Sequence, residues 1–178
     1  MGQYWLPVNI DKHEYIHPHQ LASGLKLVEQ LKSHVGSALV ILLANMPEPR
    51  GGGDFDMDNN WHGPERDMTK PKYFGAPGPM PQDYPSIARQ TIGRWVGDRV
   101  VLVGDYAQED DLLKVIDAGA DYTAVDIYDV CCDDSDHTGH EHKTTPWTNI
   151  THLVARVIEH ECQGKFTGDG WRTFERLP

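Results

Sequence analysis

An acidic, histidine-rich segment, residues 131–146, holds the side chains best suited to metal chemistry. Imidazoles, thiolates and carboxylates are the groups that bind Zn²⁺ in proteins, and this segment contains all three. Its histidines are His137, His140 and His142, and the last two would face one side of an extended chain. The segment lacks paired CxxC units and an HExxH helix, so a solvated polar loop is the alternative interpretation.

Three more histidines, His13, His17 and His19, lie near the start of the chain. His17 and His19 flank a proline, and such a His-x-His pair is typical of metal-dependent hydrolases, where alternate side chains of one strand meet a single ion. One hypothesis is therefore a zinc-dependent hydrolase. It requires these histidines, those of residues 131–146 and an acidic partner such as Asp105 to converge on one site. A surface turn with incidental histidines is the alternative, because the proline interrupts strand alternation.

A third group of polar residues occupies the ends of two expected β-hairpins. The first hairpin covers residues 4–16, and the second covers residues 92–106 with Gly97-Asp98 as its two-residue turn. If the two hairpin ends meet, their polar side chains frame one pocket for a small-molecule ligand. Turn and salt-bridge roles are the alternative. The six pocket candidates are Asp11, Lys12, Asp98, Arg99, Asp105 and Tyr106.

The strands that must position these residues follow from the apolar patterns. Residues 4–10 and 14–16 are rich in aromatic and β-branched side chains. Pro7 favours an edge strand, since it has no N–H to contribute to a sheet ladder. Residues 100–103 form an apolar run without alternation, which predicts a strand covered on both faces. A further strand is expected at residues 122–130.

Three helices are expected around these strands. Residues 21–33 carry apolar side chains at helical spacing, so one stripe should face the core. Residues 38–44 are apolar on every side, which allows a buried helix or a buried strand, and their leucines and alanines favour a helix. A last helix should begin near Ile150, with Thr148 or Asn149 as its N-cap. The stripe of the first helix comprises Leu21, Leu25, Val28, Leu31 and Val35.

Proline density separates regular from irregular parts of the chain. Eight of the twelve prolines fall within residues 47–90, a density that excludes long regular elements, so this span should be an irregular insertion. Phe166, Trp171 and Phe174 predict that the C-terminal residues dock onto the body. These elements together predict one α+β domain over residues 1–178, with a small mixed or antiparallel sheet of β-hairpins packed with two or three helices.

Four segments resemble a family of small hypothetical proteins from bacteria, phages and some eukaryotes. They are an opening segment with an N-x-DK pattern (residues 4–12), a His-Pro-His unit (residues 17–19), a GGGD loop (residues 51–54) and a W-x-GDR-x4-GDY segment (residues 95–106). The resemblance covers the N-terminal half of the chain and the second expected hairpin. It implies no activity, because no function is assigned to that family. The proline-rich and histidine-rich loops depart from the family's shorter form, so chemistry placed in them would belong to this member.

Charge and cysteine content limit the expected partners. Twenty-seven acidic and sixteen basic residues give a formal charge of −11, which would repel a nucleic-acid backbone. No run of about 18 apolar residues suggests a membrane span, and the first residues lack the pattern of a signal peptide. Three cysteines, an odd number, fit a reducing compartment. We therefore expect a cytoplasmic protein that binds neither nucleic acid nor membranes.

No complete catalytic set is evident, so the sequence favours a non-catalytic binding or regulatory domain whose ligand is a protein or a small molecule. A metal-dependent hydrolase that uses clustered histidines and carboxylates is the first alternative. A homo-oligomeric structural subunit is the second. Zinc is the cofactor that the residue types suggest.

Overall fold

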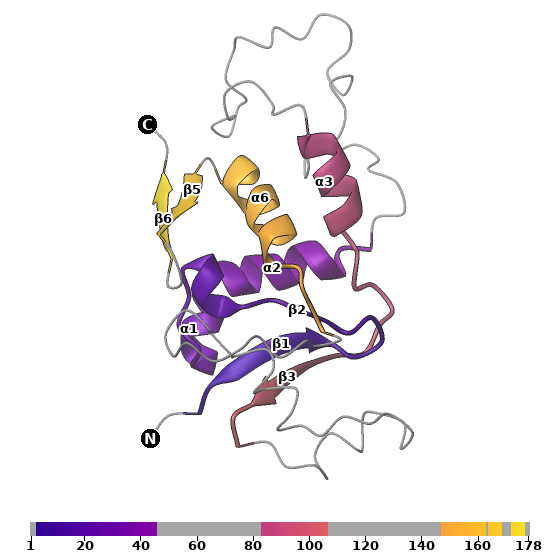
Figure 1. Ribbon diagram of the computed structural model, residues 1–178, viewed down its shortest axis with the longest axis vertical. Helices are drawn as coiled ribbons and strands as arrows, with labels where there is room; N and C mark the ends of the chain where they lie inside the picture. The colour runs from indigo at the N-terminus through magenta and orange to yellow at the C-terminus, as the bar shows by residue number, and fades with distance from the viewer. Residues whose placement is uncertain (1–2, 46–82, 107–146, 163, 169–171, 177–178) are drawn as a thin grey trace, which may run out of the picture.

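The computed structural model describes residues 3–45, 83–106, 147–162, 164–168 and 172–176. Within them, helices and sheets of few strands form a small α+β domain, which confirms the predicted fold class (Figure 1). The expectations for residues 122–130 and 131–146, for Trp171 and for most of residues 47–90 lie outside the described residues. None of the described helices is long and apolar enough to cross a membrane.

A four-stranded sheet is built from β1 (Trp5–Asn9), β2 (Glu14–Tyr15), β3 (Val100–Gly104) and β4 (Thr148–Asn149). The strand order is β3-β1-β2-β4. β1 runs antiparallel to β2 and β3, whereas β2 and β4 run parallel. The pairing of β1 with β2 confirms the hairpin expected at residues 4–16.

Pro7 lies in β1 between two neighbouring strands, so the edge position expected for it is wrong. The bond from Ile10 N to Arg99 O, 2.9 Å long, shows that even-numbered residues point their backbone groups at β3. Pro7 points the other way, and its carbonyl accepts a hydrogen bond from Ile16 N at 3.2 Å. The missing N–H therefore leaves the ladder between β1 and β3 intact.

Residues 92–98 form turns, so the second expected hairpin is wrong, and β3 pairs with β1 instead. Hydrogen bonds tie these turns to the end of a helix: Gly93 N donates to Ile41 O and Trp95 N donates to Leu42 O, both at 2.9 Å. The Trp95 side chain is fully buried. Burial of a large aromatic side chain outweighs the local strand propensity of this segment.

Among the described strands, β3 lies at an edge of the sheet, and its exposure differs from the prediction. Val103 is buried, whereas Leu102 is 37% exposed. The apolar run at residues 100–103 is therefore not covered on both faces.

The single helix expected over residues 21–33 is wrong. The chain forms a 3-10 helix, η1 (Pro18–Leu21), and a separate five-residue helix, α1 (Leu27–Leu31). Ala22, between them, adopts a left-handed backbone conformation with φ 52°, which ends η1. The break changes the direction of the chain, so the two parts of the expected stripe no longer share one face.

Burial follows this break. Leu21 and Val35 at the ends of the expected stripe are buried in the core, whereas Val28 is 60% exposed and Leu31 is 73% exposed. Helical periodicity therefore predicted a buried position for Val28 and Leu31, and both are exposed.

The apolar run at residues 38–44 lies in a helix, α2 (His34–Leu43), as its composition favours. The Ser33 hydroxyl caps this helix by accepting a hydrogen bond from Val35 N at 3.3 Å. One side of α2 joins the core, but Val40 is 70% exposed. The run is therefore not buried on every side.

A further helix, α3 (Tyr84–Thr91), lies inside the span of residues 47–90 that composition predicts to be irregular, so that prediction is wrong for these residues. Pro85 fits the first turn of the helix, because the N–H groups of that turn have no partner within the helix. Pro85 therefore lies at the start of a helix and not in an irregular segment.

The last expected helix is confirmed as α6 (Thr151–Glu161). The N-cap position is Ile150, one residue after the expected caps, so that detail is wrong, although the Asn149 side chain accepts a hydrogen bond from Thr151 N at 2.9 Å. α6 packs against α2 and α3 above the sheet (Figure 1). The largest buried side chains of this core include Ile16, Leu21, Leu42, Tyr84, Trp95, Ile150 and Ile158.

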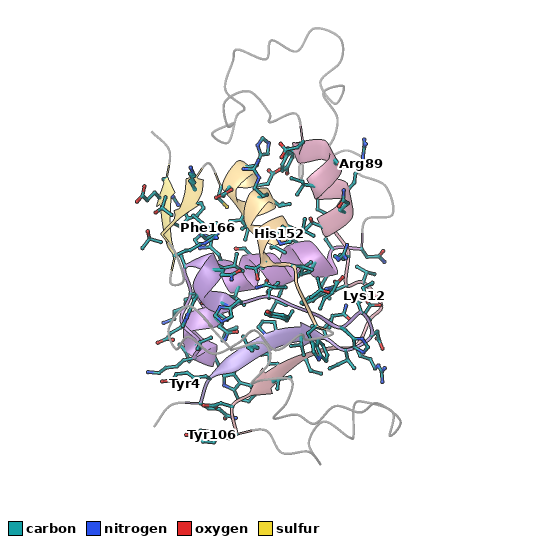
Figure 2. The ribbon with its side chains drawn as sticks, viewed as in Figure 1. Tyr4, Lys12, Arg89, Tyr106, His152 and Phe166 are labelled. Atoms are coloured by element: carbon teal, nitrogen blue, oxygen red, sulfur yellow. The ribbon has the colours of Figure 1, made fainter. Side chains whose placement is uncertain are left out.

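A C-terminal hairpin that the sequence does not predict consists of β5 (Gly164–Thr167) and β6 (Thr173–Arg176). Phe166, labelled in Figure 2, is buried, and Phe174 packs against the same core. The predicted docking is confirmed for these two aromatic residues. Each strand has only four residues, the shortest length at which alternation indicates a strand.

His34, the first residue of α2, joins the hairpin to the core. Its ring centroid lies 5.2 Å from that of Phe166 and 4.4 Å from that of Phe174. Burial lowers the pKa of His34, and a hydrogen bond with the Leu21 backbone opposes this effect. The neutral imidazole is thus the form that suits this position.

We expect the free energy of unfolding to fall as the pH drops below 6.5, the ordinary pKa of histidine. Because the folded-state pKa of His34 is lowered, the unfolded chain binds the proton first, and stability present above 6.5 is lost toward the lower folded value. Urea unfolding followed by circular dichroism at several pH values measures this slope. His34→Gln should flatten it, whereas His152→Gln, at an exposed position on α6, should not. Equal slopes for the wild type and His34→Gln would contradict the assignment.

Gly93 and Gly97 form a matched pair for testing the turn segment. Both have positive φ, 71° and 83°, so alanine at either position adopts a left-handed conformation that costs about 1–2 kcal/mol. A Cβ on Gly93 would also lie 2.6 Å from Ala44 O, whereas a Cβ on Gly97 meets nothing within 4 Å. We therefore expect Gly93→Ala to lower the unfolding free energy more than Gly97→Ala, as measured by urea denaturation. An equal loss would mean that the contact with Ala44 relaxes freely.

Candidate functional site

A buried ion pair joins the first hairpin to the turns at residues 92–98. Glu14 is 5% exposed, and its carboxylate accepts hydrogen bonds from Arg94 Nη2 at 2.5 Å, Arg94 Nε at 2.9 Å and Trp95 Nε1 at 2.9 Å. The hydrogen bond to Glu14 raises the pKa of Arg94. Three donors thus satisfy a carboxylate that would be strongly destabilising if it were buried alone.

Asn9 and Lys12 extend this arrangement to Asp98. Asn9 is fully buried; its Nδ2 donates to Asp98 at 2.8 Å and its Oδ1 accepts from Lys12 N at 2.9 Å. The Lys12 ammonium pairs with Asp98 and donates to Arg94 O at 2.6 Å. The hydrogen bond from Lys12 holds the pKa of Asp98 below its ordinary value.

An exposed ion pair completes the set. Arg99 donates to the Asp11 carboxylate from its backbone N at 2.6 Å and from Nε at 2.7 Å, and the side-chain hydrogen bond lowers the pKa of Asp11. We call the whole set the polar network; its members are Asn9, Asp11, Lys12, Glu14, Arg94, Trp95, Asp98 and Arg99.

The polar network contains four of the six residues expected to frame a pocket, and the structure does not bring the other two to it. Asp105 and Tyr106 follow the opposite end of β3, and Asp105 is about 20 Å along the strand from Arg99 at the usual rise per residue. Tyr106 and Lys12 lie far apart in Figure 2. The charges of the other four are paired with one another, which fits the turn and salt-bridge roles weighed for them.

The N-terminal histidines do not lie on one strand. His17 precedes η1 in an extended conformation and His19 is within η1, so strand alternation does not apply to them. Their ring centroids are nevertheless 5.3 Å apart, and His13 contacts Trp147 edge-on at 5.2 Å.

Across the part of the chain that the structure describes, no three histidine, cysteine, aspartate or glutamate side chains gather as a metal site. His137, His140 and His142 lie outside that part. Zinc binding by these residues with His17 and His19 stays a prediction.

The most unusual surface lies on α1. Tyr4 and Leu27 are 41% exposed, Val28 is 60% exposed and Leu31 is 73% exposed. The three α1 residues share one helical face, because Leu27 lies four positions and Val28 three positions before Leu31. Trp5 N donates to Leu25 O at 2.9 Å, so the start of β1 and Tyr4 lie beside α1 (Figure 2). We call Tyr4, Leu27, Val28 and Leu31 the α1 surface.

The opposite face of α1 is polar and points inward. Gln30 is 3% exposed, and its Nε2 donates to Trp5 O at 2.6 Å and to Leu25 O at 2.9 Å. No described residue donates a hydrogen bond to its buried Oε1. A buried amide with an apolar outer face is the reverse of the usual arrangement of a surface helix, and folding stability alone disfavours it.

Two lysines flank the α1 surface. Lys26 precedes α1 and Lys32 follows it, and both are exposed. Neither ammonium forms an ion pair with a described carboxylate. Glu29, the one acidic residue of α1, uses its carboxylate to accept a hydrogen bond from Lys26 N at 3.1 Å. The α1 surface is therefore apolar with a cationic border.

The sequence contained a signal for this surface that periodicity obscured. Ser23-Gly24 interrupts the expected helix, and a Cβ on Gly24 would lie 2.0 Å from Glu29 Oε2, so the chain turns there closely against α1. A helix restarted after a turn has no reason to keep the phase of the preceding stripe. Gln30, in the middle of the apolar residues, was the second indication.

No protein-family model, curated protein or solved structure matches the chain. The resemblance of the N-x-DK and W-x-GDR patterns to a family of small hypothetical proteins stays a prediction. Both patterns belong to the polar network, so their residues have a structural role whatever the family.

We expect Glu14→Gln to lower the unfolding free energy by about 1–3 kcal/mol, because the amide cannot accept hydrogen bonds from both the partly buried Arg94 guanidinium and the buried Trp95 indole N–H as the carboxylate does. Asp11→Asn, which removes the carboxylate of the exposed pair with Arg99, should have a much smaller effect. Chemical denaturation of the two variants and the wild type makes the comparison. Similar losses for both variants would show that the buried pair is not the dominant contact of the polar network.

Proposed function

We propose that this chain is a non-catalytic protein-binding module that holds an apolar segment of a partner protein on the α1 surface. The observation that supports this most strongly is the reversed orientation of α1, with leucine and valine outside and Gln30 inside. Contiguous exposed apolar side chains on an ordered element are typical of interaction sites. Departures from local folding rules also concentrate at functional positions.

The border of the α1 surface defines the chemistry of the partner. The ammonium groups of Lys26 and Lys32 lack described carboxylate partners, so a bound segment with acidic residues beside its apolar ones would pair with them. The chain's formal charge of −11 opposes the approach of such a segment. At physiological salt, however, charges farther than about 8 Å apart are largely screened, so the nearest lysines govern the contact.

The size of the α1 surface favours a short segment. A stable interface between two folded proteins buries about 800 Å² on each partner, which is more than four side chains provide. A peptide of one or two helical turns, or a short extended segment, matches the area. We therefore expect binding in the micromolar range, about −8 kcal/mol.

The free thiol of Cys162 is compatible with a binding role in a reducing compartment such as the cytoplasm. Partial burial raises the pKa of this thiol, which keeps it protonated and a poor nucleophile at neutral pH.

Selection from a displayed library of random peptides against the purified full chain tests the proposal. We expect the selected peptides to combine apolar residues with aspartate or glutamate. Their affinities, measured by fluorescence anisotropy, should fall at least tenfold in Leu31→Glu, because the new carboxylate repels the acidic residues and interrupts the apolar face.

Val40→Glu is the matched control, since Val40 is equally exposed but lies on α2. It should bind the same peptides as tightly as the wild type does. Peptides whose binding is insensitive to Leu31→Glu, or a library that yields no specific peptide, would overturn the proposal. Circular dichroism on each variant separates lost binding from lost folding.

A further inference from the structure

β3 presents an open sheet edge. It is first in the strand order β3-β1-β2-β4, so one side pairs with β1 and the other side has no neighbour among the described strands. The hydrogen bond from Ile10 N to Arg99 O shows that odd-numbered residues of this stretch direct their backbone groups toward β1. The backbone N–H and C=O groups that point outward therefore belong to Val100, Leu102 and Gly104.

These outward groups make no hydrogen bond with any residue in the described ranges. Edge strands usually carry a charged residue, a proline or a bulge that prevents pairing with another chain. Val100–Gly104 has none of these, and Leu102 is 37% exposed. Within the described residues, the edge is thus an apolar strand without a charge, a proline or a bulge.

We propose that a second copy of this chain pairs with the open edge of β3, with the two β3 strands antiparallel about a two-fold axis at Leu102. This register places Leu102 opposite Leu102 of the second copy and Val100 opposite Gly104. Every outward-pointing residue then meets another outward-pointing residue, so all six N–H groups of the two edges donate across the interface. The two four-stranded sheets become one continuous sheet. This inference is independent of the peptide-binding role of α1.

Charge favours the antiparallel direction. Arg99 precedes β3 and Asp105 follows it. In the proposed register, Arg99 of each copy lies opposite Asp105 of the other, in a non-hydrogen-bonded pair where side chains approach most closely. A parallel arrangement would place like charges side by side. Arg99 already binds Asp11, and the Asp105 carboxylate already accepts a hydrogen bond from Tyr4 N at 3.1 Å, but a guanidinium has five N–H donors and a carboxylate can accept several hydrogen bonds.

Sedimentation velocity on the full chain over a wide range of concentrations tests the pairing. We expect a concentration-dependent dimer. Leu102→Pro should weaken it at least tenfold, because proline removes an outward N–H while the bonds to β1 stay intact. Arg99→Asp should also weaken it, and the double variant Arg99→Asp with Asp105→Arg should restore it, because the complementary pairs form again.

Val40→Lys is the control for a general loss of apolar surface and should leave the dimer unchanged. A wild type that stays monomeric at every concentration overturns the proposal, as does a dimer that is insensitive to Leu102→Pro. Hydrogen exchange then identifies the alternative: a slowly exchanging Leu102 amide in a monomer means that another part of the same chain covers the edge. Peptide selection on α1 can succeed or fail without affecting this result.

Discussion

The rest of the described structure depends on the carboxylate of Glu14. This side chain lies in the two-residue strand β2, yet it binds Arg94 and Trp95, which are 80 and 81 positions away in the sequence. Because the carboxylate is buried, it needs these donors, and because Trp95 is buried, its indole N–H needs an acceptor. The hydrogen bond from the Trp95 indole N–H to the Glu14 carboxylate therefore offsets the desolvation cost of burying both groups. It also fixes the turns at residues 92–98 against the first hairpin.

The remaining arrangement follows from that contact. Once Trp95 is in place, Asp98 meets Asn9 and Lys12, and Arg99 meets Asp11. The chain then enters β3 in register with β1, and no other described strand pairs with the outer edge of β3. The helices form a second layer whose core also takes in Ile16 and Trp95, so one hydrophobic cluster joins the helices to the first hairpin and to the turns at residues 92–98 (Figure 1).

Sequence patterns predicted the fold class and the elements that rest on local signals. The first hairpin, the helix at residues 38–44 and the helix from Ile150 have continuous apolar patterns with caps or turns. The second hairpin was wrong, because a Gly-Asp turn was given more weight than a tryptophan whose burial depends on Glu14. That contact is long-range, and local propensity carries no information about it.

The candidate site was predicted only in part. Four of the six pocket candidates, Asp11, Lys12, Asp98 and Arg99, do meet. They follow β1 or precede β3, and the pairing of these two strands brings those ends together. The α1 surface was missed, because periodicity identifies a face without saying what covers it. Only the break at Ala22 and the inward bonds of Gln30 reveal that the face is outside.

The order of pairing in the sheet has a consequence for how the chain acquires its structure. β1 and β2 are made first, but β1 is completed by β3, and β2 is completed by β4, where Thr148 pairs with Glu14 across 134 positions (148 − 14). Closing such long loops costs entropy before any contact stabilises them, so proteins of this kind fold slowly. During synthesis, the edge of β1 therefore stays unpaired until residues 100–104 have left the ribosome, and the edge of β2 stays unpaired until residues 148–149 have left it.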